Sequence, residues 1–255
     1  MQKTILIALF VAFLFKATPS LAWGAQGHKL VAQTAKAYLN KGIQDSVIKY
    51  LGNMSFESAA VWMDEVRKDP FFDYMKTWHY VDFEKDKTYV DTKTPDIVNE
   101  LEKAILQLEE RKKYTPDEVK MNLKLLFHLV GDLHMPLHTG YKDDKGGNTI
   151  NVKFLGNNTN LHRVWDTEMI ESDKNFNDKL SKMAAKVTKA QIRTIGKIDV
   201  SEWMNQSRTL LPEVYNFSNG VIDQAYVDKN IPVVETQILN AGIRLASVLN
   251  EVFGK

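Results

Sequence analysis

Apolar residues recur every three or four positions along most of this chain, which is the spacing that places them on one face of an α-helix. This spacing predicts helices at 30–39, 43–51, 55–66, 94–108, 116–134, 161–166, 180–190 and 202–211, and a long helix after Pro232. Alternation typical of a strand occurs at 149–155, and a turn is expected at 156–160. The pattern therefore predicts an all-α fold: a single compact multi-helix domain with a short β-hairpin near 149–160.

The helix at 116–134 has the clearest start and stop signals. Thr115 can cap its first turn, Glu118 can bond back to the cap, and Pro116 suits the first helical position. Pro136 should end the helix soon after residue 134, since proline blocks the helical hydrogen-bond pattern. The residues that follow are expected on a separate segment that turns back toward the helix.

Histidine and aspartate gather on and beside this helix. His128 and Asp132 are one turn apart and share a face, and His138 follows just beyond Pro136. His162 and Asp166 repeat the same four-residue spacing on the next predicted helix. One such pair alone is more often a hydrogen bond on a helix surface than a metal site, but two pairs, with His138 just beyond the first, favour a metal site.

Composition narrows the chemistry of that site. The chain has no cysteine, so any metal must be held by histidine, carboxylate or backbone groups. It has 33 Lys and Arg residues against 32 Asp and Glu residues, which gives no general excess of positive charge. Binding to nucleic acid through charge alone is therefore not expected, and any affinity for phosphate must come from a local site.

The first 22 residues have the features of a signal peptide. Lys3 precedes an apolar run at 5–15, and small residues near Ala22 suit cleavage after that position. We expect residues 1–22 to be removed and residues 23–255 to form one domain that is secreted or periplasmic. A membrane anchor is the alternative, although the run is short for a spanning helix of about 20 residues.

Six short motifs, in this order, resemble one known family. They are Trp23 with His28 five residues on, Trp62-x-Asp64-x-x-Arg67, Trp78-His79-Tyr80-Val81-Asp82, His128-x-x-x-Asp132-x-x-x-x-x-His138, Gly146-Gly147-Asn148, and His162-x-x-x-Asp166. Together they resemble the single-strand-specific zinc nucleases of fungi and plants, also called 3′-nucleotidases. The match spans residues 23–166, and the helical remainder suits the same fold.

From the residues alone, the segment 77–83 is expected as a loop or extended piece.

The resemblance implies three zinc ions at the base of a cleft. It assigns the first ion to Asp64, His79, His128 and Asp132. It assigns the second ion to the α-amino and carbonyl groups of Trp23, to His28 and to a shared Asp132. It assigns the third ion to His138, His162 and Asp166. His134 is left without a metal and is expected to have a structural role near the site.

The resemblance also implies an activity: a secreted zinc-dependent endonuclease that hydrolyses phosphodiester bonds of single-stranded DNA and RNA to 5′-nucleotides and also acts on 3′-nucleotides. Zinc ions activate water and stabilise the leaving oxygen in such sites. Asp64 would orient the water, and Arg67, one turn along, would neutralise charge on the phosphoryl oxygens. A plain salt bridge with Asp64 or Glu65 is the alternative for Arg67.

Three further residues are implied to bind substrate. Tyr80 corresponds to a family aromatic residue that stacks on a base, with tyrosine here where phenylalanine is common, and Asp82 to one that bonds the edge of the base. Asn148 could contact substrate or only shape its turn. We expect single-stranded nucleic acid and 3′-nucleotides as substrates, no stable membrane association and a monomer.

Two other functions remain open at this point. A zinc-dependent phospholipase C of similar helical architecture would typically have glutamate where Asp166 stands. A secreted zinc-binding protein without catalysis would not need both Asp64 and Arg67.

Overall fold

Helices make up most of the chain that the computed structural model describes, residues 23–254. The α-helices are α1 (Ala25–Ala37), α2 (Lys41–Leu51), α3 (Phe56–Val66), α4 (Ile97–Glu109), α5 (Pro116–Leu133), α6 (Leu161–Arg163), α7 (Met169–Ser172), α8 (Phe176–Ala184), α9 (Lys189–Ile195), α10 (Val200–Arg208), α11 (Leu211–Val214) and α12 (Gln224–Phe253). Short 3₁₀ or π helices lie between them: η1 (Pro70–His79), η2 (Arg111–Lys113), η3 (Pro136–Thr139), η4 (Lys142–Asp144) and the π helix η5 (Val164–Glu168). The predicted signal peptide, residues 1–22, lies outside the described residues.

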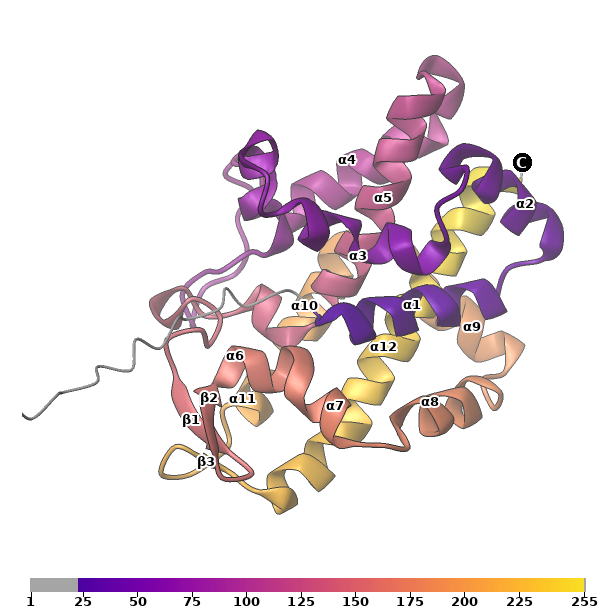
Figure 1. The fold of residues 1–255 in the computed structure, drawn as a ribbon. Coiled ribbons are helices and arrows are strands. Elements are labelled where there is room, and N and C mark those ends of the chain that lie inside the picture. Colours follow the sequence, from indigo (N-terminus) through magenta and orange to yellow (C-terminus); the bar gives the residue numbers. More distant parts are fainter. Residues whose placement is uncertain (1–22, 255) are drawn as a thin grey trace, which may run out of the picture.

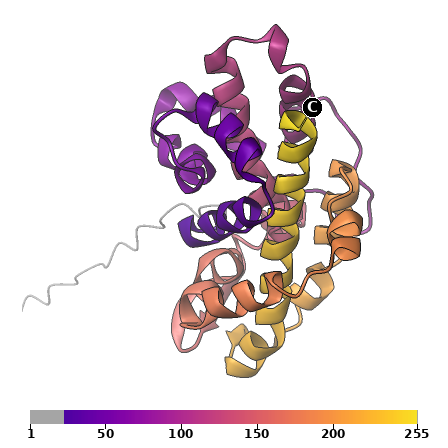
Figure 2. The same cartoon turned by 90° about the vertical axis from the view of Figure 1, so that its right-hand side faces the viewer.

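Helices α5 and α12 form the centre of the fold. Every residue of α5 from Asn122 to Leu133 is buried, and Figure 2 shows α12 running along most of the length of the molecule. Helix α1 crosses α12 (Figure 1) and also packs on α3 and α5. The crossing is close because residue 242 is glycine: a Cβ atom there would collide with Thr34 of α1. This packing brings the start of α1 against the buried face of α5.

A small three-stranded sheet flanks the helices and contains the hairpin predicted near 149–160. Strands β1 (Asn151–Phe154) and β2 (Asn157–Asn160) pair antiparallel, with Asn151 opposite Asn160. Leu155 and Gly156 both have positive φ, as a two-residue hairpin turn demands. Residues 157–160 were expected as a turn and are instead the second strand. A third strand, β3 (Val221–Ile222), pairs parallel with β1 and is too short to be seen from sequence.

Helical boundaries differ from the predictions where local caps or prolines intervene. The helix expected at 180–190 is divided, because Thr188 and Gln191 form a capping box that starts α9. The helix expected at 202–211 ends at Arg208, since the Pro212 ring would clash with a helical carbonyl at that position.

Two more boundary predictions are wrong. Part of the segment expected as loop, 77–79, is the end of η1, which starts where Asp69 accepts a hydrogen bond from the backbone N–H of Phe71 at 3.0 Å. The last helix begins at Gln224 rather than after Pro232. Pro232 is tolerated inside α12 because it lies on the exposed side, where water can bond to the carbonyl of Asp228 that loses its partner.

The all-α prediction is otherwise confirmed, and α5 begins with the predicted capping box of Thr115 and Glu118. Among residues 23–254, no helix combines the length and the apolarity that crossing a membrane requires.

Candidate metal centre and substrate cleft

Helix α5 supplies the central pair of the site. His128 and Asp132 lie one turn apart and are fully buried, with Nε2 of His128 3.1 Å from Oδ2 of Asp132. The Nδ1 atom of His128 lies 2.6 Å from the carbonyl oxygen of Ala60 on α3 and donates its hydrogen there. This bond fixes the ring and leaves the Nε2 lone pair facing the interior of the site.

Asp132 lies between histidines from two other elements. Its Oδ2 atom is 3.0 Å from Nδ1 of His79, the last residue of η1, and its Oδ1 atom is 3.1 Å from Nε2 of His28 on α1. Burial would raise the pKa of Asp132, but the positive charges available on His128 and His138 outweigh burial and hold it well below the usual range. Asp132 is therefore an ionised carboxylate with one oxygen on each side of the cluster, a geometry that suits a bridge between two cations.

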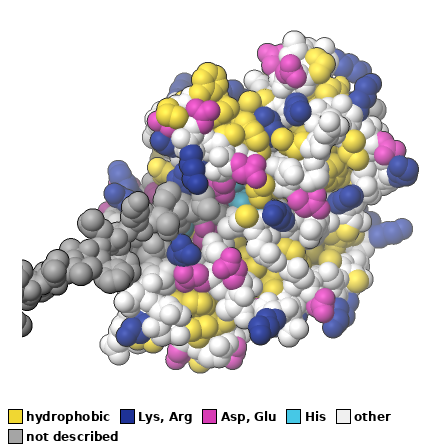
Figure 3. All heavy atoms as spheres, in the orientation of Figure 1, with side chains coloured by type: hydrophobic (Ala, Val, Ile, Leu, Met, Phe, Trp, Pro, Cys, Tyr) yellow, Lys and Arg dark blue, Asp and Glu magenta, His cyan; other side chains and the backbone are white. Residues whose placement is uncertain are grey.

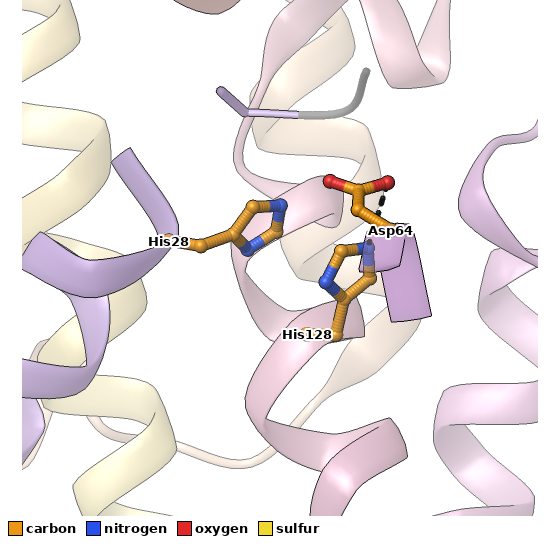
Figure 4. A group of neighbouring side chains, drawn as sticks. All are labelled: His28, Asp64 and His128. Atoms are coloured by element: carbon orange, nitrogen blue, oxygen red, sulfur yellow. Dashed lines mark ion pairs between the residues drawn. The ribbon is translucent and has the colours of Figure 1, made fainter. Parts of the chain in front are cut away.

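His28, Asp64 and His128 form a second group, drawn in Figure 4. The rings of His28 and His128 stack with their centroids 4.0 Å apart, and Oδ1 of Asp64 is 3.9 Å from Nε2 of His128. The approach of His28 depends on Gly131, because a Cβ atom at that position would lie 2.7 Å from Nδ1 of His28.

A third group consists of His138, His162 and Asp166, all buried. His138 donates from Nδ1 to the carbonyl oxygen of His79 at 2.6 Å, and His162 donates from Nδ1 to that of Gly146 at 2.7 Å. Their ring centroids lie 5.1 Å apart, with the ring planes inclined by 29°. Both hydrogen bonds leave Nε2 as the free ring nitrogen, as in many metal-binding histidines.

The side chains of these groups fit divalent cations. In each group the candidate ligand atoms lie within 4.8 Å of one another. Several buried atoms make no hydrogen bond, namely Oδ1 of Asp64, Oδ1 of Asp132, Oδ1 of Asp166 and both ring nitrogens of His28. Nε2 of His28 and Oδ1 of Asp132 are 3.1 Å apart but are not aligned as a hydrogen bond. Buried polar atoms are costly to leave unpaired, and cations bound within the three groups would satisfy them. Imidazole and carboxylate without thiolate is a donor set that zinc accepts.

Burial also raises the pKa of Asp64, and it raises the pKa of Asp166 well above the usual range, with nearby carboxylates adding to the effect. Both carboxyls therefore need a positive partner in order to ionise, which agrees with a cation site.

Trp23 lies beside the third group. Its side chain is fully buried, and the backbone N–H of Gly24 donates to the carbonyl oxygen of Asp166 at 2.8 Å. The chain segment that carries Trp23 is therefore fixed against Asp166, and His28 follows one turn into α1.

A cleft of about 630 Å³ opens onto these histidines. It is lined by Arg67, His79, Tyr80, Asp82, Leu137, His138, Lys142, Lys145, Asn148 and His162. The structure thus brings Arg67, Tyr80, Asp82 and Asn148 into one cleft with three of the candidate ligands. Tyr80 is 39% exposed, so its ring is accessible to a substrate.

Two of these residues also have structural contacts. Asp82 accepts a hydrogen bond from the backbone N–H of Gly140 at 3.1 Å, and burial raises its pKa to about 7. Asn148 donates from Nδ2 to the carbonyl oxygen of Lys145 at 2.9 Å. The bond of Asn148 shapes its turn, which was one of the two roles considered for it.

Sequence reasoning missed Arg208, which links two chain segments that line the cleft. Its guanidinium donates to the carbonyl oxygens of Phe83, Glu84, Thr139 and Gly140 at 2.6–3.1 Å. These carbonyls belong to the two segments that carry Asp82 and His138. A single arginine on a helix has no motif that would reveal such a role. Lys142 and Lys145 in the cleft wall were missed as well, although their place beside the Gly-Gly-Asn turn was a usable signal.

His134 faces away from the candidate ligands. Its Nδ1 atom donates to the carbonyl oxygen of Val130 at 2.7 Å, and its Nε2 atom accepts from Arg244 of α12 at 2.6 Å. Burial first, and the charge of Arg244 second, lower the pKa of His134 to about 3. This contact ties the end of α5 to α12.

The fold and the site together define an α-helical protein with buried His and Asp groups that could hold metal ions beside a cleft. The sequence pattern of the S1/P1 Nuclease family matches residues 23–254, and the chain belongs to this family.

Individual relatives are similar over nearly their whole length. Endonuclease 3 of Arabidopsis thaliana is 29% identical over 265 residues, covering 92% of this chain and 90% of that protein. Nuclease S1 of Aspergillus oryzae is 26% identical over 280 residues, covering 96% of each chain. Nuclease P1 of Penicillium citrinum is 27% identical over 274 residues, covering 91% of this chain and 98% of that protein.

Proposed function

We propose that this protein is a zinc-dependent endonuclease that hydrolyses phosphodiester bonds of single-stranded DNA and RNA, leaves 5′-nucleotides and also acts on 3′-nucleotides. One observation supports this most directly: the candidate ligands of five of the six motifs gather at a cleft that also presents Arg67, Tyr80 and Asp82 and, from the sixth motif, Asn148. Family membership over residues 23–254 gives independent support.

Three zinc ions would be held by the side chains described above. Asp64, His79, His128 and Asp132 would hold one; His28, the backbone of Trp23 and the shared Asp132 a second; and His138, His162 and Asp166 a third. Bound there, zinc supplies an activated water and stabilises negative charge on the oxygens of phosphorus.

The residues of the chain orient this chemistry. The hydrogen bonds from Nδ1 of His128, His138 and His162 to backbone carbonyls hold each ring in one tautomer and one direction. Asp64, mostly buried beside His128, is placed to orient the attacking water. Arg67, one turn beyond Asp64 and in the wall of the cleft, is placed to neutralise charge that grows on the phosphoryl oxygens.

Tyr80 and Asp82 give a physical basis for single-strand selectivity. A base must leave its neighbours before it can stack on Tyr80, and a duplex resists this while a single strand does not. Stacking of a base on an aromatic ring contributes about 1–3 kcal/mol. Asp82, at the same wall of the cleft, would bond the edge of the stacked base.

We further propose that residues 1–22 direct export and are cleaved after Ala22, so that the mature enzyme is secreted or periplasmic and starts at Trp23. The burial of Trp23 beside Asp166 supports this assignment, since a free amino group there would lie among the metal ligands. We propose a monomer without stable membrane association.

A substrate comparison with a metal count tests the function. The purified mature protein should contain three zinc ions and should release nucleotides from single-stranded DNA and RNA and phosphate from a 3′-mononucleotide, with far less activity on duplex DNA. Hydrolysis of phosphatidylcholine without hydrolysis of single-stranded DNA would instead support a phospholipase C. Bound zinc without either activity would contradict the enzyme proposal.

A further inference from the structure

The ten-residue 3₁₀ helix η1 presents a row of aromatic rings to solvent. A 3₁₀ helix has three residues per turn, so side chains three apart lie directly above one another. Along η1 this places Phe71, Tyr74 and Thr77 in one line, and Tyr80 caps the end of the helix. Phe71 is 74% exposed, Tyr74 is 55% exposed and Tyr80 is 39% exposed. We name Phe71, Tyr74 and Tyr80 the aromatic ridge.

The protein core leaves most of this ridge uncovered, although Phe71 packs edge-on against Phe72 at 5.0 Å and Tyr74 against Trp78 at 5.3 Å. The core-facing side of η1 is the line of Phe72, Met75 and Trp78, in which Met75 is buried and the other two are half-buried. The ring of Phe72 packs edge-on against Trp62 of α3 at 5.4 Å. Large contiguous apolar patches on the surface of a folded protein mark binding sites, whereas single exposed apolar residues do not.

We propose that the aromatic ridge is a stacking platform for bases of a single strand that flank the phosphodiester in the cleft. The proposal rests on the proposed nuclease function and extends it from one nucleotide to several. The main support is that the ridge adjoins the cleft. Tyr80, at one end of the ridge, also lines the cleft wall and directly follows the candidate ligand His79. In Figure 3, yellow hydrophobic side chains gather at the upper left, over the segment that Figure 1 shows in purple.

The spacing of the ridge suits an extended strand. Residues rise by about 2 Å each in a 3₁₀ helix, so Phe71 and Tyr74 are about 6 Å apart along the helix axis. Tyr80 lies farther along, beyond Thr77 and just past the end of the helix. Stacked bases in B-form DNA are only about 3.4 Å apart. A strand that follows the ridge must therefore be stretched, with rings of the protein inserted where neighbouring bases would lie. Single strands can adopt this conformation, and a duplex cannot without unpairing.

Charge favours stacking over phosphate contacts as the main interaction. Lys76, the cation on η1 itself, pairs with Asp73 at 2.6 Å. Lys103 of α4 lies 5.7 Å from the ring of Trp78 and pairs with Glu100 at 3.2 Å. With these cations paired, the ridge adds little net positive charge. It should therefore bind DNA and RNA alike, because every base offers a face for stacking.

Kinetics with two substrates of different length test the ridge. In the double variant Phe71→Ala/Tyr74→Ala, we expect the ratio of kcat/KM for a dodecathymidylate to kcat/KM for a 3′-mononucleotide to fall by about tenfold. Phe71→Trp should keep the ratio of the wild type. Ile48→Ala, which truncates an exposed apolar residue on α2, is the matched control. An unchanged ratio in the double variant would overturn the proposal.

A binding measurement separates this proposal from the nuclease function. Fluorescence of the introduced tryptophan in Phe71→Trp should be quenched by a phosphorothioate dodecathymidylate and not by a 3′-mononucleotide, whether or not the enzyme cleaves either. Loss of cleavage with quenching intact would reject only the nuclease function; cleavage without quenching would reject only the ridge. Sedimentation of the wild type as a dimer that Phe71→Ala/Tyr74→Ala dissociates, with an unchanged kinetic ratio, would assign the ridge to self-association.

Discussion

His28 at the start of α1 places its Nε2 atom 3.1 Å from Oδ1 of Asp132 near the end of α5, with both side chains fully buried. The contact exists because α1 crosses α12 closely and because Gly131 leaves room for the imidazole. The other oxygen of Asp132 serves His79 and His128. The carboxylate of Asp132 thus connects His28 on one side with His79 and His128 on the other. Replacement of one of its oxygens should therefore affect metal binding on both sides.

Asp132→Asn should abolish hydrolysis of single-stranded DNA while most helicity remains. An amide is nearly the same size as the carboxylate but carries no negative charge, so it cannot bridge two cations. Circular dichroism and a nuclease assay with zinc in slight excess measure the two quantities, and metal analysis should show fewer zinc ions than in the wild type. Near-normal turnover would exclude Asp132 as a bridge.

Tyr80→Ala should raise KM for short oligonucleotides far more than it lowers kcat. The reason is that a stacked base is held equally in the ground state and in the transition state, so its loss weakens binding uniformly. Tyr80→Phe, which retains the ring, serves as the control. If KM stays unchanged in Tyr80→Ala, the residue contributes only to local packing.

Arg208→Met should increase KM and decrease kcat together, although among residues 23–254 the hydrogen bonds of Arg208 go to backbone carbonyls and not to a candidate ligand side chain. Its bonds to the carbonyls of Thr139, Gly140, Phe83 and Glu84 fix the two segments that carry Asp82 and His138 relative to each other. We expect a loss of about 2–4 kcal/mol in the free energy of unfolding, because hydrogen bonds from a charged donor are strong.

Arg208→Lys should recover part of the activity, since an ammonium group can serve some of these carbonyls but not all four. Arg193→Met, on the exposed surface of α9, is the control for loss of an arginine. An Arg208→Met enzyme with unchanged kinetics and lowered stability would limit Arg208 to a purely structural role.

The candidate ligands were predictable because their positions follow from local geometry. The helical spacing of His128 and Asp132 sets a shared face, and the cap at Thr115 and the break at Pro136 fix where that helix begins and ends. The resemblance then grouped residues from separate motifs. The structure brings these residues into one buried cluster at the cleft.

Features that depend on contacts between distant segments were not predictable. Arg208 has a role only because two loops far apart in sequence present four carbonyls to it. The third strand has two residues, too few for a periodic signal. The 3₁₀ geometry of η1 was missed because its three-residue period resembles neither an α-helix nor a strand, although Asp69 and Pro70 marked its start.

Asp82→Asn should alter how stability depends on pH. Burial raises the pKa of Asp82 from 3.8 to about 7, with Asp144 adding to the effect and Gly140 and Arg208 opposing it. The folded state therefore binds a proton that the unfolded state has lost between these values, so the contribution of this group to stability falls as pH rises from about 4 to about 7.

Asparagine cannot ionise and keeps an oxygen to accept the Gly140 bond. The stability of Asp82→Asn relative to the wild type should thus increase over this range by a few kcal/mol at most, since one pKa unit corresponds to about 1.4 kcal/mol. Urea unfolding at several pH values measures this difference. A difference that does not vary with pH would mean that the carboxyl is ionised throughout.

Addition of one glycine before Trp23 should remove one zinc ion without unfolding the protein. Trp23 is fully buried, and Gly24 bonds to the carbonyl of Asp166, so the α-amino group of a chain that starts at Trp23 would lie within the candidate centre. In the extended protein that nitrogen becomes an amide, whose lone pair is delocalised into the carbonyl and cannot bind a metal. The rate should fall by orders of magnitude, because the proposed chemistry would need the complete set of ions.

Mass spectrometry of the intact metal-loaded protein and a nuclease assay decide this prediction. One glycine added after Lys255 provides the matched control, because it lengthens the chain by the same residue without altering the N-terminus. If the control retains three zinc ions and the N-terminal extension retains two, removal of residues 1–22 is itself the step that completes the metal centre, and export activates the enzyme. Three zinc ions and full activity in the extended protein would show that the N-terminus is not a ligand.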